Sequence, residues 1–105
     1  MTPFAKKVYK VVSSIPLGEV RTYKWVAKKA GLPRAYRAVG TILKNNPYPL
    51  IIPCHRVIKS NDKLGGYIFG IKRKRALLDL EKMLLRYAMN REVEFNPTEK
   101  RKKVV

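Results

Sequence analysis

The chain has 105 residues, of which 24 are Lys or Arg and 7 are Asp or Glu, so its formal net charge is +17 at pH 7. This length fits one domain that buries a core without disulfides or a structural metal. A single cysteine excludes an internal disulfide, no hydrophobic signal segment begins the chain, and no apolar run reaches membrane-spanning length. We therefore expect a cytoplasmic or nuclear protein without a membrane partner, and the charge indicates that it binds a polyanion.

The positive charge is concentrated in the middle of the chain. No acidic residue occurs between Glu19 and Asp62, whereas Lys and Arg residues are frequent there. A basic surface could simply reflect a lysine-rich, heat-adapted composition. An acid-free middle region instead favours a face that binds nucleic acid.

Thr2 and Pro3 predict the start of a first helix, because Thr is a favourable N-cap and Pro suits the first helical position. Apolar residues then recur at helical spacing as far as Ile15, opposite a lysine-rich face. Residues 16–18, Pro-Leu-Gly, end this helix with a turn, and residues 19–21 form a short extended piece. We expect this first helix to be scaffold.

Two short basic helices are predicted next. Thr22 is the N-cap candidate of a helix that runs to about Ala30, where Gly31 stops it, and a further helix is expected from about Arg34 to Lys44. Two short helices joined by a tight turn suggest a helix-turn-helix that binds DNA. A generic helical hairpin is the alternative, but such a hairpin has no reason to be this basic.

The stretch of residues 51–58 holds the only cysteine and the only histidine side by side, Cys54 and His55. Prolines at 47 and 49 end the preceding helix, Pro53 fixes φ just before the cysteine, and apolar residues flank the pair. This pattern predicts a buried, rigidly held turn. A lone cysteine is often an inert core residue, and on local sequence alone that alternative stays open.

Residues 56–59 and 64–67 are predicted to form a small β-hairpin, which beside a helix-turn-helix would be a wing. A last helix is predicted from about Ile71 to Tyr87 or Met89. Its expected apolar stripe consists of Leu77, Leu80, Met83, Leu84 and Ala88. The predicted fold is therefore mainly α, a winged helix-turn-helix-like domain over residues 1–90, followed by a charged and flexible tail over residues 91–105.

Cys54 can act as a nucleophile only as a thiolate, which requires a nearby base or positive charge. His55 and Arg56 are the candidates, but neighbours in an extended segment point to opposite sides, so a turn or a bridging water must connect Cys54 to His55. Glu81, near the edge of the last helix's apolar stripe, is predicted to fix the histidine tautomer, which gives a Cys–water–His–Glu relay. The alternative for Glu81 is a surface ion pair with a basic residue of its own helix.

Metal and cofactor sites are not expected. One cysteine and one histidine fall short of the three or four ligands that a zinc site needs. The glycine spacings of phosphate-binding and dinucleotide-binding loops do not occur. We therefore expect a protein without a cofactor.

These residues resemble the DNA-binding, active-site domain of O6-alkylguanine-DNA alkyltransferases, also called methylated-DNA–protein cysteine methyltransferases. The resemblance covers Phe4 to Glu81 nearly without gaps, and its most specific motif is Pro-Cys-His-Arg at 53–56. Further matches are Ile-Pro-Leu-Gly-Glu-Val at 15–20, Thr-Tyr at 22–23, Arg-Ala-Val-Gly at 37–40, Asn-Pro at 46–47 and Gly-Gly-Tyr at 65–67. The resemblance implies DNA repair by a stoichiometric enzyme. An alkyl group passes from O6 of a flipped-out guanine in duplex DNA to Cys54, with binding through the minor groove.

The resemblance also implies a role for each matching residue. The expected catalytic residues are Cys54 as nucleophile, His55 and Glu81 as its relay, and Tyr23 as the residue that supports flipping and donates to the leaving guanine. Arg37 is expected to fill the vacated space in the base stack. Other residues expected at the DNA are Thr22, Ala35, Tyr36, Ala38 and Lys44. Residues expected at the substrate pocket or its hinge are Asn46, Pro49, Val57, Tyr67, Ile68 and Lys74.

Two other functions are weighed against alkyl transfer. An alkyltransferase-like lesion binder would recognise O6-alkylguanine without transfer and recruit excision repair, but such proteins typically carry Trp or Ala where this chain has Cys54. A winged-helix regulator would explain the basic face but not the set of Cys54, His55 and Glu81. Most members of the resembling family carry an additional N-terminal domain, and this chain begins at the first helix of the active domain. We expect a monomer whose partner is double-stranded DNA containing O6-alkylguanine.

Overall fold

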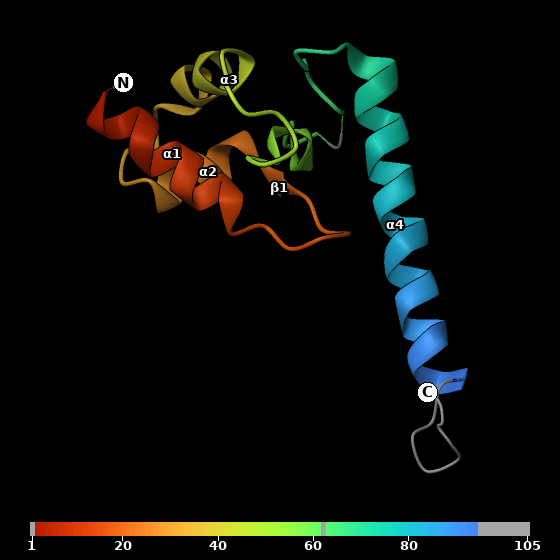
Figure 1. Cartoon of the computed structure of the whole chain (residues 1–105). Helices are drawn as coiled ribbons and strands as arrows, with labels where there is room; N and C mark the ends of the chain where they lie inside the picture. Colours follow the sequence, from red (N-terminus) through yellow and green to blue (C-terminus); the bar gives the residue numbers. More distant parts are fainter. Residues whose placement is uncertain (1, 62, 95–105) are drawn as a thin grey trace.

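The structure is a computed structural model that describes residues 2–61 and 63–94 (Figure 1). Its helices are α1 (Pro3–Ser13), α2 (Tyr23–Lys29), α3 (Tyr36–Lys44) and α4 (Ile71–Glu94), and Cys54–Arg56 form a 3-10 turn, η1. The strands of the described part are β1 (Arg21–Thr22) and β2 (Val57–Ile58). The predicted mainly α class is confirmed.

Both predicted N-caps are present. The hydroxyl oxygen of Thr2 accepts a hydrogen bond from the backbone N–H of Ala5 at 3.1 Å, and that of Thr22 accepts from Trp25 at 3.0 Å. α3 begins at Tyr36 rather than near Arg34, because residues 33–35 form a separate turn in which the N–H of Ala35 donates to the carbonyl of Leu32 at 2.9 Å. α2 and α3 nevertheless form the expected helix-turn-helix pair.

The core lies between α1, α2 and α3. Val8 of α1, Val26 of α2 and Val39 of α3 are fully buried and belong to one apolar cluster. The hydroxyl of Tyr9 donates to the carbonyl oxygen of Ile42 at 2.8 Å and so joins α1 to α3. Because each helix turns one apolar face inward, the three helices form the rigid base on which the rest of the chain is placed.

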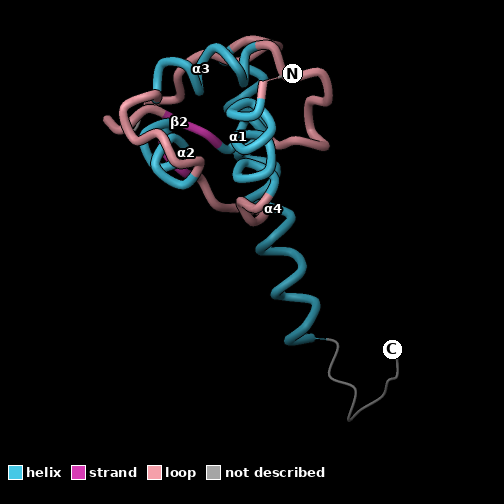
Figure 2. Tube along the Cα trace, turned by 90° about the vertical axis from the view of Figure 1, so that its left-hand side faces the viewer, coloured by secondary structure: helices cyan, strands magenta, loops and turns pink. Residues whose placement is uncertain are grey.

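The small sheet differs from the predicted hairpin. β1 pairs with β2 in parallel, with Arg21 opposite Val57 and Thr22 opposite Ile58, and β2 is seen among helices α1, α2 and α3 in Figure 2. Residues 64–67 form no strand, so the predicted hairpin wing is wrong. The reason is that the backbone carbonyls of residues 64 and 66 accept hydrogen bonds from a buried lysine of α4 instead of from a neighbouring strand.

α4 is longer than predicted and packs through a different face. The predicted apolar stripe is wrong as a core stripe, because Leu80, Met83 and Leu84 are 48–63% exposed. Among residues 71–89 of α4, the buried side chains are those of Lys74 and Glu81, at 0% and 8% exposure. Only the first half of the helix lies against the domain, and its second half extends beyond the other helices (Figure 1).

α4 also runs across the predicted domain boundary at residue 90, and residues 95–105 of the predicted tail lie outside the described residues. In the described part, no helix combines the length and the apolar character needed to cross a membrane.

We predict that Tyr9→Phe lowers the free energy of unfolding by about 1 kcal/mol, because the substitution leaves the carbonyl of Ile42 without its donor. Urea unfolding followed by circular dichroism measures the change. Tyr48→Phe is the matched control, since Tyr48 is 59% exposed and should unfold at the wild-type midpoint. Equal midpoints for Tyr9→Phe and the control would show that the bond between α1 and α3 contributes nothing.

Candidate active site

A rigid turn presents Cys54. Pro53 has φ −78° and ψ 66°, the conformation of an inverse γ-turn, and the N–H of Cys54 donates to the carbonyl of Ile52 at 2.7 Å. The fixed φ of proline suits this conformation. Cys54 and His55 are both buried. The prediction of a buried, rigidly held turn is confirmed. Because Cys54 and His55 lie in this turn and not in an extended segment, their side chains need not point to opposite sides.

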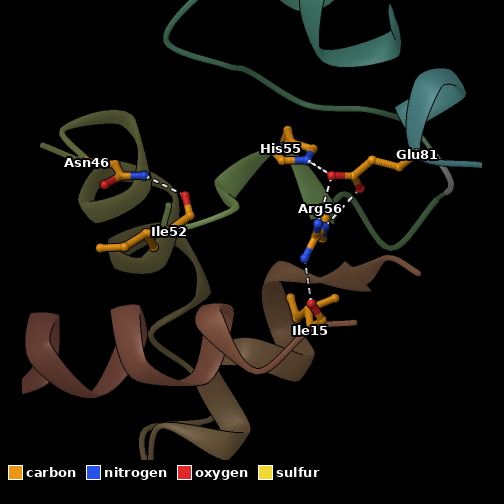
Figure 3. Close-up of polar contacts among 6 residues, drawn as sticks. All are labelled: Ile15, Asn46, Ile52, His55, Arg56 and Glu81. Atoms are coloured by element: carbon orange, nitrogen blue, oxygen red, sulfur yellow. Dashed lines mark hydrogen bonds and ion pairs between the residues drawn. The ribbon is translucent and has the colours of Figure 1, made fainter. Parts of the chain in front are cut away.

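The carboxylate of Glu81 is the centre of a buried polar cluster (Figure 3). His55 Nε2 lies 2.7 Å from Glu81 Oε2. Arg56 donates from Nε to Oε1 at 2.8 Å and from Nη2 to Oε2 at 2.7 Å, and its Nη1 donates to the carbonyl of Ile15 at 2.8 Å. Glu81 therefore pairs with η1, and the alternative of a surface ion pair along its own helix is wrong.

The protonation of this cluster follows from its contacts. Burial alone would raise the pKa of Glu81, but hydrogen bonds from Arg56 and His55 outweigh burial, so the pKa lies below its ordinary value. Glu81 is therefore a carboxylate at neutral pH and accepts the Nε2 hydrogen of His55. In a neutral ring, Nδ1 is then the acceptor atom, and it is buried without a hydrogen-bond partner among the described residues. An unpartnered buried nitrogen of this kind can take up a proton.

Cys54 lies at the wall of an open cavity of about 820 Å³. The cavity is enclosed by α2, α3, η1 and the loop after β2. Its lining residues are Tyr23, Lys24, Tyr36, Arg37, Gly40, Leu43, Lys44, Cys54, Lys59, Ser60, Asn61, Gly66 and Tyr67. The second helix of the helix-turn-helix thus forms one wall of the space into which the cysteine opens.

The cavity brings together much of the predicted site. Cys54 and Tyr23 line it together with the predicted DNA contacts Tyr36, Arg37 and Lys44. Of the predicted pocket residues, Tyr67 lines it too. His55 and Glu81 do not line the cavity and belong to the buried polar cluster.

Other predicted site residues lie elsewhere. Asn46 is buried and donates from Nδ2 to the carbonyl of Ile52 at 2.9 Å, so it joins the end of α3 to the segment before Cys54 (Figure 3). Val57 belongs to the apolar core, and Pro49 forms a bridge with Ile52. Ile68 is 43% exposed and does not line the cavity. The predicted DNA residues Thr22, Ala35 and Ala38 flank the cavity-lining positions of α2 and α3 without lining the cavity themselves.

Sequence reasoning missed several contributors. Lys24, Lys59, Ser60 and Asn61 line the cavity, and only the basic, acid-free composition of this region pointed toward the two lysines. Lys24 Nζ lies 5.4 Å from the centre of the Tyr36 ring, a cation–π distance. The role of Arg56 as a partner of Glu81 was also missed, because Arg56 was considered only as a positive charge near Cys54.

Two tyrosines of the cavity remain protonated at neutral pH. Burial, followed by the negative potential of Cys54, raises the pKa of Tyr23 and that of Tyr67 above the ordinary value. The Tyr67 ring packs edge-on at 6.3 Å between centroids against His55 and at 5.6 Å against Phe69. The hydroxyl of Tyr67 is buried without a hydrogen-bond partner among the described residues. Both phenols are therefore available as hydrogen-bond donors.

In the described part of the chain, no group of three His, Cys, Asp or Glu residues is placed to hold a metal ion. The site consists of a nucleophile, a histidine–carboxylate pair and a basic cavity mouth. Fold and site together define a helix-turn-helix domain whose second helix borders a cavity with a buried cysteine.

Comparison with known proteins identifies the family. Residues 3–83 match the family described as "6-O-methylguanine DNA methyltransferase, DNA binding domain". A methylated-DNA–protein-cysteine methyltransferase of Methanosarcina barkeri is 54% identical over 85 residues, which are 81% of this chain and 54% of that protein. The chain belongs to the 6-O-methylguanine DNA methyltransferase family through its DNA-binding domain, which confirms the resemblance found in the sequence.

Two of the solved structures that superpose with this chain are complexes with DNA. The crystal structure of Mycobacterium tuberculosis OGT in complex with DNA superposes with a TM-score of 0.77 at 51% identity, over 79% of this chain and 52% of that one. S. pombe Atl1 in complex with damaged DNA containing O6-carboxymethylguanine gives a TM-score of 0.68 at 34% identity, over 77% of each chain. The present chain spans about half the length of the curated relatives it matches.

We predict that Arg56→Ala lowers the free energy of unfolding at pH 7 by about 2–3 kcal/mol, because it leaves the buried Glu81 carboxylate without its bidentate donor. Urea unfolding measures the loss. Arg21→Ala is the control: Arg21 pairs with Glu19 on the surface, and removing an exposed pair should change stability by less than about 1 kcal/mol.

The same variant tests the lowered pKa of Glu81. A carboxyl group whose folded-state pKa is depressed stabilises the protein above its unfolded pKa and loses that contribution as pH falls through its folded pKa. Wild-type stability should therefore fall more steeply below about pH 4.3 than that of Arg56→Ala, in which the pKa is less depressed. Parallel pH profiles would contradict this assignment.

Proposed function

We propose that this protein repairs O6-alkylguanine in duplex DNA by transferring the alkyl group to Cys54, once per molecule. The observation that carries the proposal is the position of Cys54. It lines the cavity that opens along α3, and the residue that follows it, His55, is paired with Glu81. Membership of the 6-O-methylguanine DNA methyltransferase family supports the reaction type.

The groups of this site account for each bond that forms or breaks in the proposed reaction. The Cys54 thiol gives its proton to His55, directly or through a water, and Glu81 stabilises the resulting imidazolium. The thiolate sulfur attacks the alkyl carbon, a C–S bond forms, and the bond from that carbon to O6 breaks. Its electron pair leaves with guanine, whose negative charge is met by hydrogen-bond donation from Tyr23. The product is a thioether, whose C–S bond is not broken by exchange with thiols, so each Cys54 reacts once.

The cavity mouth suits a flipped nucleotide in DNA. Lys24, Arg37, Lys44 and Lys59 surround it, and each can neutralise a phosphate or enter a groove. Arg37 lies on α3 at the cavity edge, from which it would occupy the space that the extruded base vacates. Thr22, Ala35, Tyr36 and Ala38 are expected beside the DNA, and the small side chains among them permit a close approach of α3 to the minor groove.

All residues of this proposed reaction lie in one copy of the chain, so we infer that a monomer is the repairing unit. Because its proposed substrate is damaged DNA, we expect the protein where the genome lies. That is the cytoplasm of a cell without a nucleus, or otherwise the nucleus. Asn46 is proposed as the hinge residue between the DNA-binding helices and the reactive turn, on the basis of its bond to Ile52.

A lesion-binding function without transfer is the second candidate. It is favoured by the likeness to S. pombe Atl1, whose structure in complex with damaged DNA containing O6-carboxymethylguanine superposes with a TM-score of 0.68. Cys54 beside a histidine–carboxylate pair favours transfer, since a binder needs no activated nucleophile.

We predict that incubation with duplex DNA containing O6-methylguanine adds the mass of one methyl group to the protein, located on the peptide that contains Cys54. Intact-protein mass spectrometry and peptide mapping measure the adduct. Cys54→Ala should bind the same DNA without gaining mass. An unchanged wild-type mass together with tight lesion binding would establish the lesion-binding function instead.

We predict that Arg37→Ala slows repair of duplex DNA by roughly tenfold or more, because filling the vacated base position offsets a few kcal/mol of unstacking. Reaction of Cys54 with free O6-benzylguanine should be unchanged, since the free base needs no extrusion. Arg34→Ala is the matched control, because Arg34 is exposed but does not line the cavity. Equal losses on DNA and on the free base would assign Arg37 to folding or to the pocket.

A further inference from the structure

Tyr36 is a large aromatic residue that the fold leaves accessible at the first position of α3. It is 37% exposed. Among the described residues, it belongs neither to the apolar cluster of α1, α2 and α3 nor to the side chains packed against that cluster. It lines the same cavity as Cys54 and directly precedes Arg37. An accessible aromatic ring that lines a cavity and does not fill the core is suited to bind a ligand.

A cation from the neighbouring helix holds this ring. Lys24 Nζ, on α2, lies 5.4 Å from the centre of the Tyr36 ring on α3. In the described part of the chain, Lys24 forms no ion pair with an acidic side chain. Because a cation prefers the face of an aromatic ring, this contact restricts the orientation of the ring. The ring is therefore positioned before any ligand arrives.

The space beside the ring is open. Gly40 follows Tyr36 by four residues on α3, so the two lie on the same side of the helix, and both line the cavity. A Cβ atom placed on Gly40 would meet no atom within 4 Å. The wall that α3 contributes to the cavity is thus a ring next to an unfilled space.

Tyr36 lies nearer to solvent than the reactive cysteine. Cys54 is 4% exposed, whereas Tyr36 is 37% exposed and its partner Lys24 is exposed as well. The cavity therefore has an inner part at Cys54 and an outer part at Tyr36.

The chemistry of the lesion determines which of its parts meets each end of the cavity. In the proposed reaction, the alkyl carbon on O6 must lie against the Cys54 sulfur. O6 is attached to the six-membered ring of guanine, whereas the deoxyribose is attached to N9 of the five-membered ring, at the other end of the base. A guanine with O6 directed inward therefore has its deoxyribose in the outer part of the cavity. The C–H groups of a deoxyribose form an apolar surface that can pack on an aromatic ring.

We propose that Tyr36 forms a binding site for the deoxyribose of the extruded nucleotide, with Lys24 as the positioning residue that holds the ring in place. The proposal rests on the proposed alkyl transfer and adds a contact by which the site distinguishes a nucleoside from a free base. This role differs from that of Arg37, which is proposed to act in the space that the base leaves behind.

The test uses two reagents that differ only in the sugar, O6-benzylguanine and O6-benzyl-2′-deoxyguanosine. The second-order rate constant for alkylation of Cys54 is measured with each reagent by intact-protein mass spectrometry. The ratio of the nucleoside rate to the free-base rate should be about three- to tenfold lower in Tyr36→Ala than in wild type, the effect of losing one aromatic contact. Tyr36→Phe keeps the ring and should retain the wild-type ratio.

Tyr48→Ala is the matched control, because Tyr48 is 59% exposed and does not line the cavity. It should keep the wild-type rate with both reagents. A wild-type ratio in Tyr36→Ala would overturn the sugar site. Equal slowing with both reagents gives such a ratio, and it would assign Tyr36 to the base pocket or to folding.

The role of Lys24 is tested with the same reagents, which carry no phosphate, so that a phosphate contact of the lysine does not enter. Lys24→Met should lower the ratio by about two- to threefold, because the ring is no longer held. Lys24→Arg should restore it, since a guanidinium also packs on an aromatic face. In the Tyr36→Ala background, Lys24→Met should lower the ratio no further, and additive losses would overturn the positioning role.

The outcomes separate this inference from the proposed function. A wild-type protein that gains no alkyl group from either reagent or from duplex DNA containing O6-methylguanine overturns both. A reactive wild type whose ratio is unchanged in Tyr36→Ala overturns only the sugar site. If the free reagents react too slowly to compare, single-stranded DNA containing O6-methylguanine decides. Tyr36→Ala should then react about three- to tenfold more slowly than Tyr36→Phe, and equal rates would overturn the site.

Discussion

The Glu81 carboxylate is the contact on which the arrangement of the site depends, because three distant parts of the chain meet there. Its two oxygens accept from Arg56 and His55, and the same Arg56 reaches the carbonyl of Ile15 just beyond α1. A buried anion with satisfied acceptors determines the orientation of its donors, whereas its removal would leave the His55 imidazole without this partner and the Arg56 guanidinium with only the Ile15 carbonyl. One acidic side chain therefore orients the imidazole behind Cys54 and attaches α4 to the domain.

The charges of the molecule fall into two groups with different physical behaviour. Lys24, Lys44 and Lys59 at the cavity mouth face water, so their attraction to phosphate is screened by salt and determines affinity more than reaction rate. Lys74 and Glu81 lie inside, where water does not screen them and where each is held by hydrogen bonds. Ionic strength should thus change how often the protein meets DNA, and leave the chemistry at the cysteine nearly unaffected.

Much of the site was predictable because its signals are local. The caps at Thr2 and Thr22, the proline before Cys54 and the helix-turn-helix pair each depend on neighbouring residues. The pairing of β1 with β2 was not predictable, since it joins segments more than thirty residues apart. Periodicity did not predict the inner face of α4, because it selected Leu80, whereas the domain binds Lys74 and Glu81. Glu81 was predicted only as the carboxylate that His55 requires. Polar side chains enter a core only where distant partners satisfy them, and those partners are set by the tertiary fold.

The uneven packing of α4 has a consequence for local stability. Up to Glu81 the helix is held by buried contacts, but residues 82–89 have only exposed side chains. Backbone hydrogen bonds in that second half can open without disturbing any contact of Cys54 or Glu81, so their opening free energy should lie below that of the first half. Amide hydrogen exchange should therefore divide α4 into a slowly exchanging half, tied to global unfolding, and a rapidly exchanging half. The boundary between the two halves would show how far along α4 the contacts of the reactive site stabilise the helix.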